Sequence, residues 1–183
     1  MTVRIVELGV TFVVAFLVLT VGSFLSLRPH LSEVRAEAAS DWKEFRRSVE
    51  ERNKALPGLA QALRGFEAGH GRLTDNLMAT RAVLMHSNDP DGIVAAVEEM
   101  NRLLKRVQEL ALTLPKLNEY PPFAGHWAEV TRSTRRIQEK REVYNKTAKL
   151  YNRLLSPFPQ SLLVALFGFV KLNDYPVVTK FDM

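Results

Sequence analysis

Apolar residues recur at steps of three and four along most of the chain beyond Pro29. Four runs show this spacing, and they cover residues 31–49, 59–84, 93–114 and 127–155. The spacing places apolar side chains along one stripe of a helix, and no stretch alternates polar and apolar for long enough to predict a strand. Because a single helix cannot bury its own stripe, the predicted fold class is all-α, with the helices packed as an antiparallel up-down four-helix bundle.

Proline and glycine mark the expected helix ends. Pro57-Gly58 interrupts the apolar runs, because proline lacks an amide N–H and disfavours helix in the residue before it. We expect the chain to reverse there; the alternative is that the first helix continues through Pro57 with a kink. Ser87–Gly92 reads as a turn followed by a helix start, and the remaining connections are bracketed by Pro115, Pro121, Pro122, Pro157 and Pro159.

The opening of the chain is apolar without periodicity. Leu8 to Leu27 is a run of 20 residues without a charge. As a helix it spans ~30 Å, the thickness of a hydrocarbon core. The alternatives are a buried core helix or a cleaved signal peptide, but a signal peptide has a shorter apolar region with a small-residue cleavage site just after it. We expect an uncleaved transmembrane anchor in residues 1–28, a helical bundle in 29–170 and a tail in 171–183.

Charges flanking the apolar run favour one orientation. Arg4 and Glu7 precede it, whereas the residues that follow within about twenty positions include Arg28, Arg35, Lys43, Arg46 and Arg47. The positive-inside tendency therefore predicts a cytoplasmic bundle on a single-pass membrane protein. The lipid bilayer is then the first expected partner.

Composition narrows the chemistry. The 183 residues are 46% hydrophobic and 25% charged, with no cysteine and a formal net charge of +5. No two histidines stand four residues apart, and the chain has neither a glycine-rich phosphate loop nor a G-x-S-x-G motif. It also lacks a helix-turn-helix pattern. We expect no enzyme activity, metal, cofactor or nucleic-acid partner, and we identify no small-molecule substrate.

A Tyr-Asn pair at Tyr144-Asn145 returns seven residues later at Tyr151-Asn152. Two turns separate the tyrosines, so both fall on the apolar stripe of the last run. The asparagines follow beside the stripe, where an amide can bind a neighbouring helix or loop. The repeat therefore favours a packing role. A ligand-binding role for the cluster Arg141, Tyr144 and Asn145 stays open as the alternative.

Arg141 lies on the same stripe, where a charge is unexpected. In one interpretation it sits at the stripe's edge, with its stem packed and its guanidinium in water. In the other it is buried, and an acidic residue on another helix pairs with it, because an unpaired buried charge is very costly. The acids considered as partners are Glu44, Glu50 and Glu51.

The opposite face of this helix is basic. Six cations gather there, diluted by Glu139 and Glu142: Arg132, Arg135, Arg136, Lys146, Lys149 and Arg153. A solvated helix face is one interpretation, and a surface for anions is the other. Lipid headgroups are the better anionic candidate, since the anchor already holds the protein at a membrane.

Several motifs together resemble the LemA family of bacterial proteins. They are Arg141-Glu-Val-Tyr144-Asn145, Tyr151-Asn152, Phe158-Pro159, Leu166-Phe167-Gly168-Phe169 and, upstream, Arg52-Asn-Lys-Ala-Leu56-Pro57-Gly-Leu59. Two positions depart from the family pattern, because Lys54 and Thr134 stand where acidic residues are typical. The resemblance implies a membrane-anchored helical bundle without a catalytic role.

Taken together, the sequence predicts a non-enzymatic scaffold or adaptor that presents a helical surface at a membrane. The alternative is a protein that organises membranes by self-association. Residues 160–170 should lie near the bilayer, where they either seal the end of the bundle or rest in the membrane interface.

Overall fold

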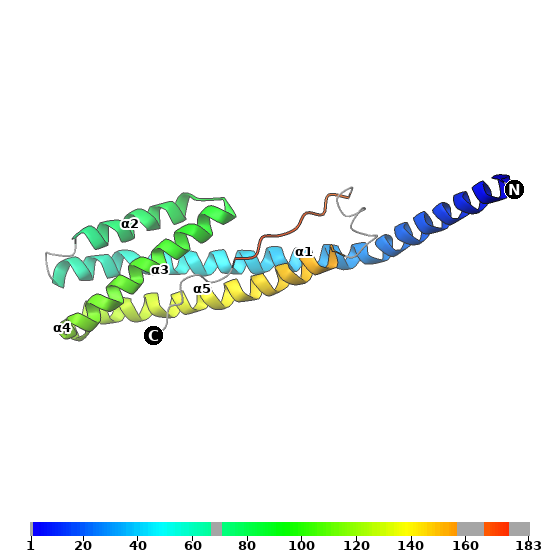
Figure 1. Ribbon diagram of the computed structural model, residues 1–183. Helices are drawn as coiled ribbons and strands as arrows, with labels where there is room; N and C mark the ends of the chain where they lie inside the picture. Colours follow the sequence, from blue (N-terminus) through cyan, green and yellow to red (C-terminus); the bar gives the residue numbers. More distant parts are fainter. Residues whose placement is uncertain (1, 67–70, 157–166, 176–183) are drawn as a thin grey trace. The chain divides into compact units, whose positions relative to one another are not determined.

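The computed structural model describes residues 2–66, 71–156 and 167–175, which form helices and connecting segments without a strand. The helices are α1 (Thr2–Phe66), α2 (Gly71–His86), α3 (Pro90–Thr113), α4 (Pro115–Glu119) and α5 (Pro121–Leu154) (Figure 1). The predicted all-α class with an apolar N-terminal helix is confirmed for the described part of the chain.

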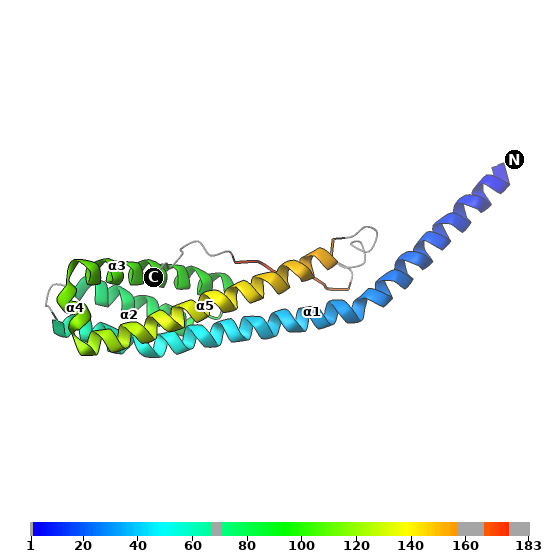
Figure 2. The ribbon, with the colours of Figure 1, turned by 90° about the horizontal axis from the view of Figure 1, so that it is seen from below.

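The chain divides into two compact units. Unit 1 comprises Met1–Asp41 and Tyr144–Asp174, and unit 2 comprises Trp42–Val143 and Tyr175–Met183. Helices α1 and α5 are each continuous, so each contributes one part to either unit (Figure 2). The expected boundary between residues 28 and 29 is not marked by a helix end, because α1 continues through Pro29.

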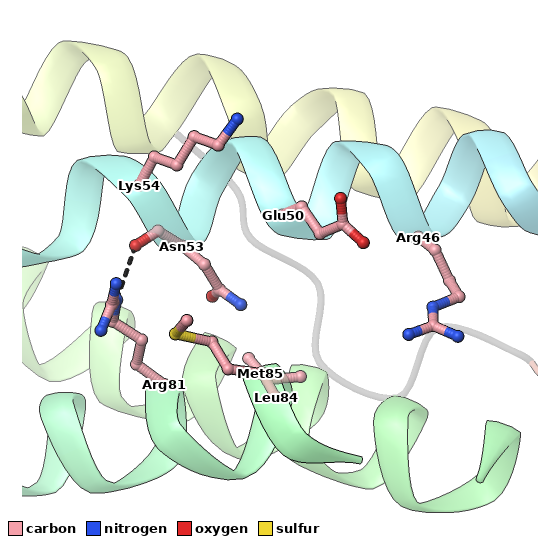
Figure 3. A pocket seen from close by; sticks show the side chains of 7 residues that line it. All are labelled: Arg46, Glu50, Asn53, Lys54, Arg81, Leu84 and Met85. Atoms are coloured by element: carbon pink, nitrogen blue, oxygen red, sulfur yellow. Dashed lines mark hydrogen bonds between the residues drawn. The ribbon is translucent and has the colours of Figure 1, made fainter. Parts of the chain in front are cut away.

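The prediction that Pro57-Gly58 ends the first amphipathic helix is wrong, because α1 continues through both residues. Proline removes the N–H that would bind the carbonyl four residues earlier, which is that of Asn53. Arg81 of α2 replaces this donor: its Nε donates to the Asn53 carbonyl oxygen at 2.8 Å (Figure 3). Gly58 gives room for α5, since a Cβ at that position would lie 2.3 Å from Cε1 of His126.

The second predicted run, residues 59–84, therefore belongs to two helices. Residues 59–66 end α1 and residues 71–86 form α2, while 67–70 lie outside the described residues. The third and fourth runs correspond to α3 and α5. The N-terminus of α3 is capped by Asp89, whose Oδ2 accepts a hydrogen bond from the Gly92 amide at 2.8 Å. The spacing of apolar residues did not predict the five-residue α4.

Unit 2 has one apolar core to which α1, α2, α3, α4 and α5 contribute. α2 and α3 run side by side in both views (Figures 1 and 2). Each large apolar side chain that is fully buried stabilises the fold by ~1.5–3 kcal/mol. Those with no exposed surface are Phe45, Leu56, Leu59, Leu63, Leu77, Val97, Met100, Leu104, Val107, Leu117, Phe123 and Val130.

Unit 1 has a smaller core between α1, the end of α5 and the segment 167–174. Its buried members are Phe24, Leu31, Val34, Tyr151 and Leu155. Leu27, Leu154, Phe169 and Leu172 pack against them and are partly buried. Of the segment 160–170 considered above, residues 160–166 lie outside the described residues, so only 167–170 can be placed.

Candidate functional site

A buried ion cluster joins three helices of unit 2. Arg52 comes from α1, Glu98 from α3 and Arg141 from α5, and these residues are 0%, 6% and 1% exposed. Arg141 Nη1 donates to Glu98 Oε1 at 2.5 Å. With so little solvent around it, this pair is screened far less than a surface pair, and removing one partner would leave a buried charge uncompensated.

Arg52 extends the cluster with polar contacts. Its Nη1 donates to Asn101 Oδ1 at 2.8 Å and more weakly, at 3.5 Å, to the Thr134 hydroxyl. Burial, and then the neighbouring Arg141, lower the pKa of Arg52 to about 9, although Glu98 acts in the opposite direction. Arg52 is therefore still charged at neutral pH, and the cluster combines two cations with one carboxylate.

The cluster holds more donors than acceptors. The Nε and Nη2 atoms of both Arg52 and Arg141 are buried without a hydrogen-bond partner among the residues that the structure describes. The Glu98 carboxylate lies between two buried guanidinium groups: it pairs with Arg141 and favours the charged form of Arg52. The three helices are thereby tied at one level, because sliding any of them would separate charges that lack solvent.

The edge position considered for Arg141 is wrong, since the side chain is buried. Its ion-pair partner is Glu98, not one of the three acids named from the sequence. Glu44 lies 3.8 Å from Lys140 and Glu51 lies 2.7 Å from Arg136, in exposed or half-exposed pairs. The third, Glu50, is exposed at the surface of α1.

Two members of the cluster were missed, although the sequence carries a signal for one. Arg52 continues the buried stripe of α1 at the same steps of four and three, between Val49 and Leu56. The predicted helix end at Pro57 separated Arg52 from the apolar residues that follow it, so the stripe was not recognised as continuous. Glu98 stands next to Val97 and so flanks the main stripe of α3; its burial depends on which helix lies opposite, and spacing does not give that.

A second set of polar contacts, in unit 1, holds residues 172–174 against α5. We call it the Asn152 clamp. The Asn152 amide binds the backbone of Leu172 twice: Nδ2 donates to the carbonyl oxygen at 2.7 Å, and the Leu172 amide donates to Oδ1 at 2.9 Å. In the first Tyr-Asn pair, the Tyr144 hydroxyl donates to the Asn173 carbonyl oxygen at 3.0 Å. Lys149 adds an ion pair with Asp174 at 3.4 Å. One residue of each Tyr-Asn pair, Tyr144 and Asn152, therefore binds the backbone of this segment.

The remaining residues of the repeat also belong to unit 1. Tyr151 is fully buried in the small core, and burial raises the pKa of its hydroxyl. Asn145 is half-buried. The ligand role considered for Arg141, Tyr144 and Asn145 stays a prediction, and Arg141 is paired with Glu98.

The six cations of the predicted basic face are all exposed on α5. Arg132, Arg135 and Arg136 belong to unit 2, and the other three to unit 1. Two are engaged in ion pairs, Arg136 with Glu51 and Lys149 with Asp174. Exposed pairs of this kind contribute ~0–1 kcal/mol, so the face is chiefly a solvated surface with a residual positive charge.

A pocket of about 250 Å³ opens between α1 and α2 in unit 2 (Figure 3). Arg46 and Arg81 stand at its two ends, Asn53 lies between them, and the ammonium group of Lys54 points away. Leu84 and Met85 of α2 form its apolar wall, and Glu50 is its carboxylate. The pocket therefore combines an apolar wall with two arginines and one carboxylate.

These features define an all-helical protein whose first helix includes a stretch long and apolar enough to cross a membrane. The LemA family model matches residues 41–181, which is most of the chain. The chain belongs to the LemA family. No curated protein matches it.

Proposed function

We propose that this protein is a single-pass membrane protein whose helices beyond the anchor form an up-down four-helix bundle, acting as a non-enzymatic scaffold or adaptor at the membrane surface. One observation carries the proposal. The first part of α1 exposes nearly all of its apolar side chains, with Phe12 74% and Leu19 73% exposed, whereas its later part is buried in the core of unit 2.

A membrane explains this exposure. Residues 9–25 carry no charge and expose every apolar side chain except Phe24, and the apolar surface is far larger than soluble proteins usually leave in water. Their helix spans about 25 Å at 1.5 Å per residue, close to the thickness of a hydrocarbon core. A helix satisfies its own backbone there, so lipid is a suitable solvent for it. The basic residues that follow favour a cytoplasmic position for the remaining helices.

The scaffold role depends on a rigid surface held at the bilayer. The ion cluster of Arg52, Glu98 and Arg141 fixes three helices in one register. On the outside, Val83 and Met85 of α2 are more than half exposed beside the pocket that ends in Arg46 and Arg81. This surface suits a protein partner with an apolar side chain and acidic neighbours. Self-association through the same surface is the alternative.

Crosslinking in membranes tests the proposal. Because the chain has no cysteine, Met85→Cys gives a unique thiol beside the pocket, and Leu112→Cys gives a matched thiol on the exposed face of α3. For an adaptor we expect a heterologous adduct from Met85→Cys and much less from Leu112→Cys. A ladder of the protein's own multiples would favour self-association. Equal, diffuse adducts at both positions would contradict a defined contact surface.

A further inference from the structure

Residues 167–170 cover α1 where its apolar stretch ends. The ring of Phe167 stacks on that of Phe24 with centroids 4.7 Å apart, and Phe169 meets the same ring edge-on at 6.3 Å. Gly168 between them has a φ of +73°, a conformation that glycine adopts readily and other residues rarely do. This turn lets both aromatic rings reach Phe24, which has no exposed surface.

Residues 167–172 are held in place by contacts at both of their ends. Its C-terminal part is clamped to α5 through the two hydrogen bonds between Asn152 and Leu172. At its N-terminal end the guanidinium of Arg28 lies 6.0 Å from the centroid of the Phe167 ring. The position of residues 167–172 along α1 is therefore fixed by contacts within unit 1.

Despite these contacts, the segment keeps apolar surface on its outside. Phe167 is 51% exposed and Val170 is 71% exposed. On α1 the neighbouring Leu25 and Val21 are also exposed, so the apolar surface is continuous with that of the anchor stretch. Arg28 and Lys171 are exposed beside it. Apolar side chains bordered by cations are typical of a helix or loop at the membrane interface.

We propose that residues 167–170 form a second membrane contact, in which Phe167 and Val170 enter the lipid interface beside the anchor and Arg28 and Lys171 lie among the headgroups. This inference rests on the proposed membrane anchoring. The occupant is lipid because Phe167 packs on Phe24 within the apolar stretch of α1, where Val21 and Leu25 are also exposed. The contact sets the depth at which the end of the apolar stretch of α1 lies in the membrane. Because Asn152 holds Leu172, the contact also sets the position of the end of α5 relative to the lipid surface.

Depth-dependent quenching tests the contact in the full-length protein. Val170→Cys, labelled with an environment-sensitive fluorophore, is reconstituted into vesicles of phosphatidylcholine and phosphatidylglycerol, with or without lipids that carry a nitroxide either near the headgroup or deep on the acyl chain. Val18→Cys in the anchor serves as the positive control. Lys146→Cys, exposed on α5 in the same unit, serves as the matched negative control.

We expect nitroxide lipids to quench the label at position 170 about twofold or more and to leave the label at 146 unchanged. Quenching at 18 but not at 170 would overturn the second contact while leaving the anchor intact. Absence of quenching at both 18 and 170 would overturn the anchor as well. A blue-shifted label at 170 that no nitroxide lipid quenches would show that protein, such as a second copy, covers this surface, and would also refute the proposal.

Discussion

The two parts of α1 share one backbone and differ in what surrounds them. Residues 9–25 carry no charge and expose nearly all of their apolar side chains, with Phe24 as the exception, whereas residues 42–66 carry charges on one side and bury the other in the core of unit 2. The difference shows that apolar content alone does not decide where a helix lies. A polar face opposite the stripe makes a helix suited to a protein core in water, and its absence makes a helix suited to lipid.

The largest effect is expected when the same residue type is placed in both parts. Val13→Lys with Leu17→Lys should weaken membrane insertion by about 5–7 kcal/mol, because a lysine at the centre of a membrane helix costs ~2.5–3.5 kcal/mol. Leu59→Lys, at a fully buried position, should instead unfold unit 2 and leave the protein in the membrane. Membrane fractionation measures the loss of insertion, and circular dichroism measures the loss of helical structure. If Leu59→Lys released the protein from the membrane and the double variant unfolded unit 2, our assignment of the two parts of α1 would be wrong.

The buried half of α1 can be tested further through its ion cluster. Glu98→Gln leaves two buried guanidinium groups without a carboxylate and should lower the free energy of unfolding by about 3–5 kcal/mol. Arg141→Met should cost less, because Arg52 remains near Glu98, and Arg52→Met should cost least, because the Arg141–Glu98 pair remains. Denaturant titrations of the three variants give the order. If Arg52→Met were the most damaging, our charge assignment would be wrong.

A smaller effect concerns the proline within the same half. Arg81→Met removes the donor that binds the Asn53 carbonyl and should cost about 1–3 kcal/mol, the penalty of a buried acceptor without a partner. In a Pro57→Ala background the helix supplies its own N–H, so the same substitution should cost about 1 kcal/mol less. A double-mutant cycle measures this coupling. Equal costs in both backgrounds would show that Arg81 does not compensate for the proline.

The segment 167–173, which packs against the first part of α1, is held by hydrogen bonds from Asn152 and Tyr144. Asn152→Ala removes two hydrogen bonds to Leu172 and should favour local opening by about 1–3 kcal/mol. Tyr144→Phe removes one and should open the segment less. Lys171 is an exposed tryptic site within it, so the rate of cleavage there reports the opening. Unchanged cleavage in Asn152→Ala would mean that the clamp contributes little.

The smallest effect is expected at the surface. Arg136→Ala breaks an exposed pair with Glu51, which should change the free energy of unfolding by about 0–1 kcal/mol and less at high salt. The buried Arg141–Glu98 pair should show almost no salt dependence. A loss above about 2 kcal/mol for Arg136→Ala would show that this face is more than a solvated surface.

Periodicity predicted the helical class and the helices α3 and α5, and the run without a charge predicted the apolar N-terminal helix, because these follow from local spacing and composition. It failed at Pro57-Gly58, where Arg81 of another helix supplies the donor that proline lacks and Gly58 leaves room for His126. The burial of Arg141 was among the sequence alternatives, but Glu98 as its partner depends on which faces meet, and that is tertiary information. The Asn152 clamp follows the expected position beside the stripe, although its target, the Leu172 backbone, cannot be derived from the repeat.

The central claim is that the first part of α1 lies in lipid and the later part in water-facing protein. Single-cysteine variants Val14→Cys and Glu50→Cys, both at exposed positions, can be compared by their rates of reaction with N-ethylmaleimide in intact membranes. The reagent crosses membranes but needs a hydrated thiolate. We predict a reaction at position 14 that is at least about tenfold slower than at 50, with the difference lost in denaturing detergent. Equal rates in intact membranes would contradict the claim.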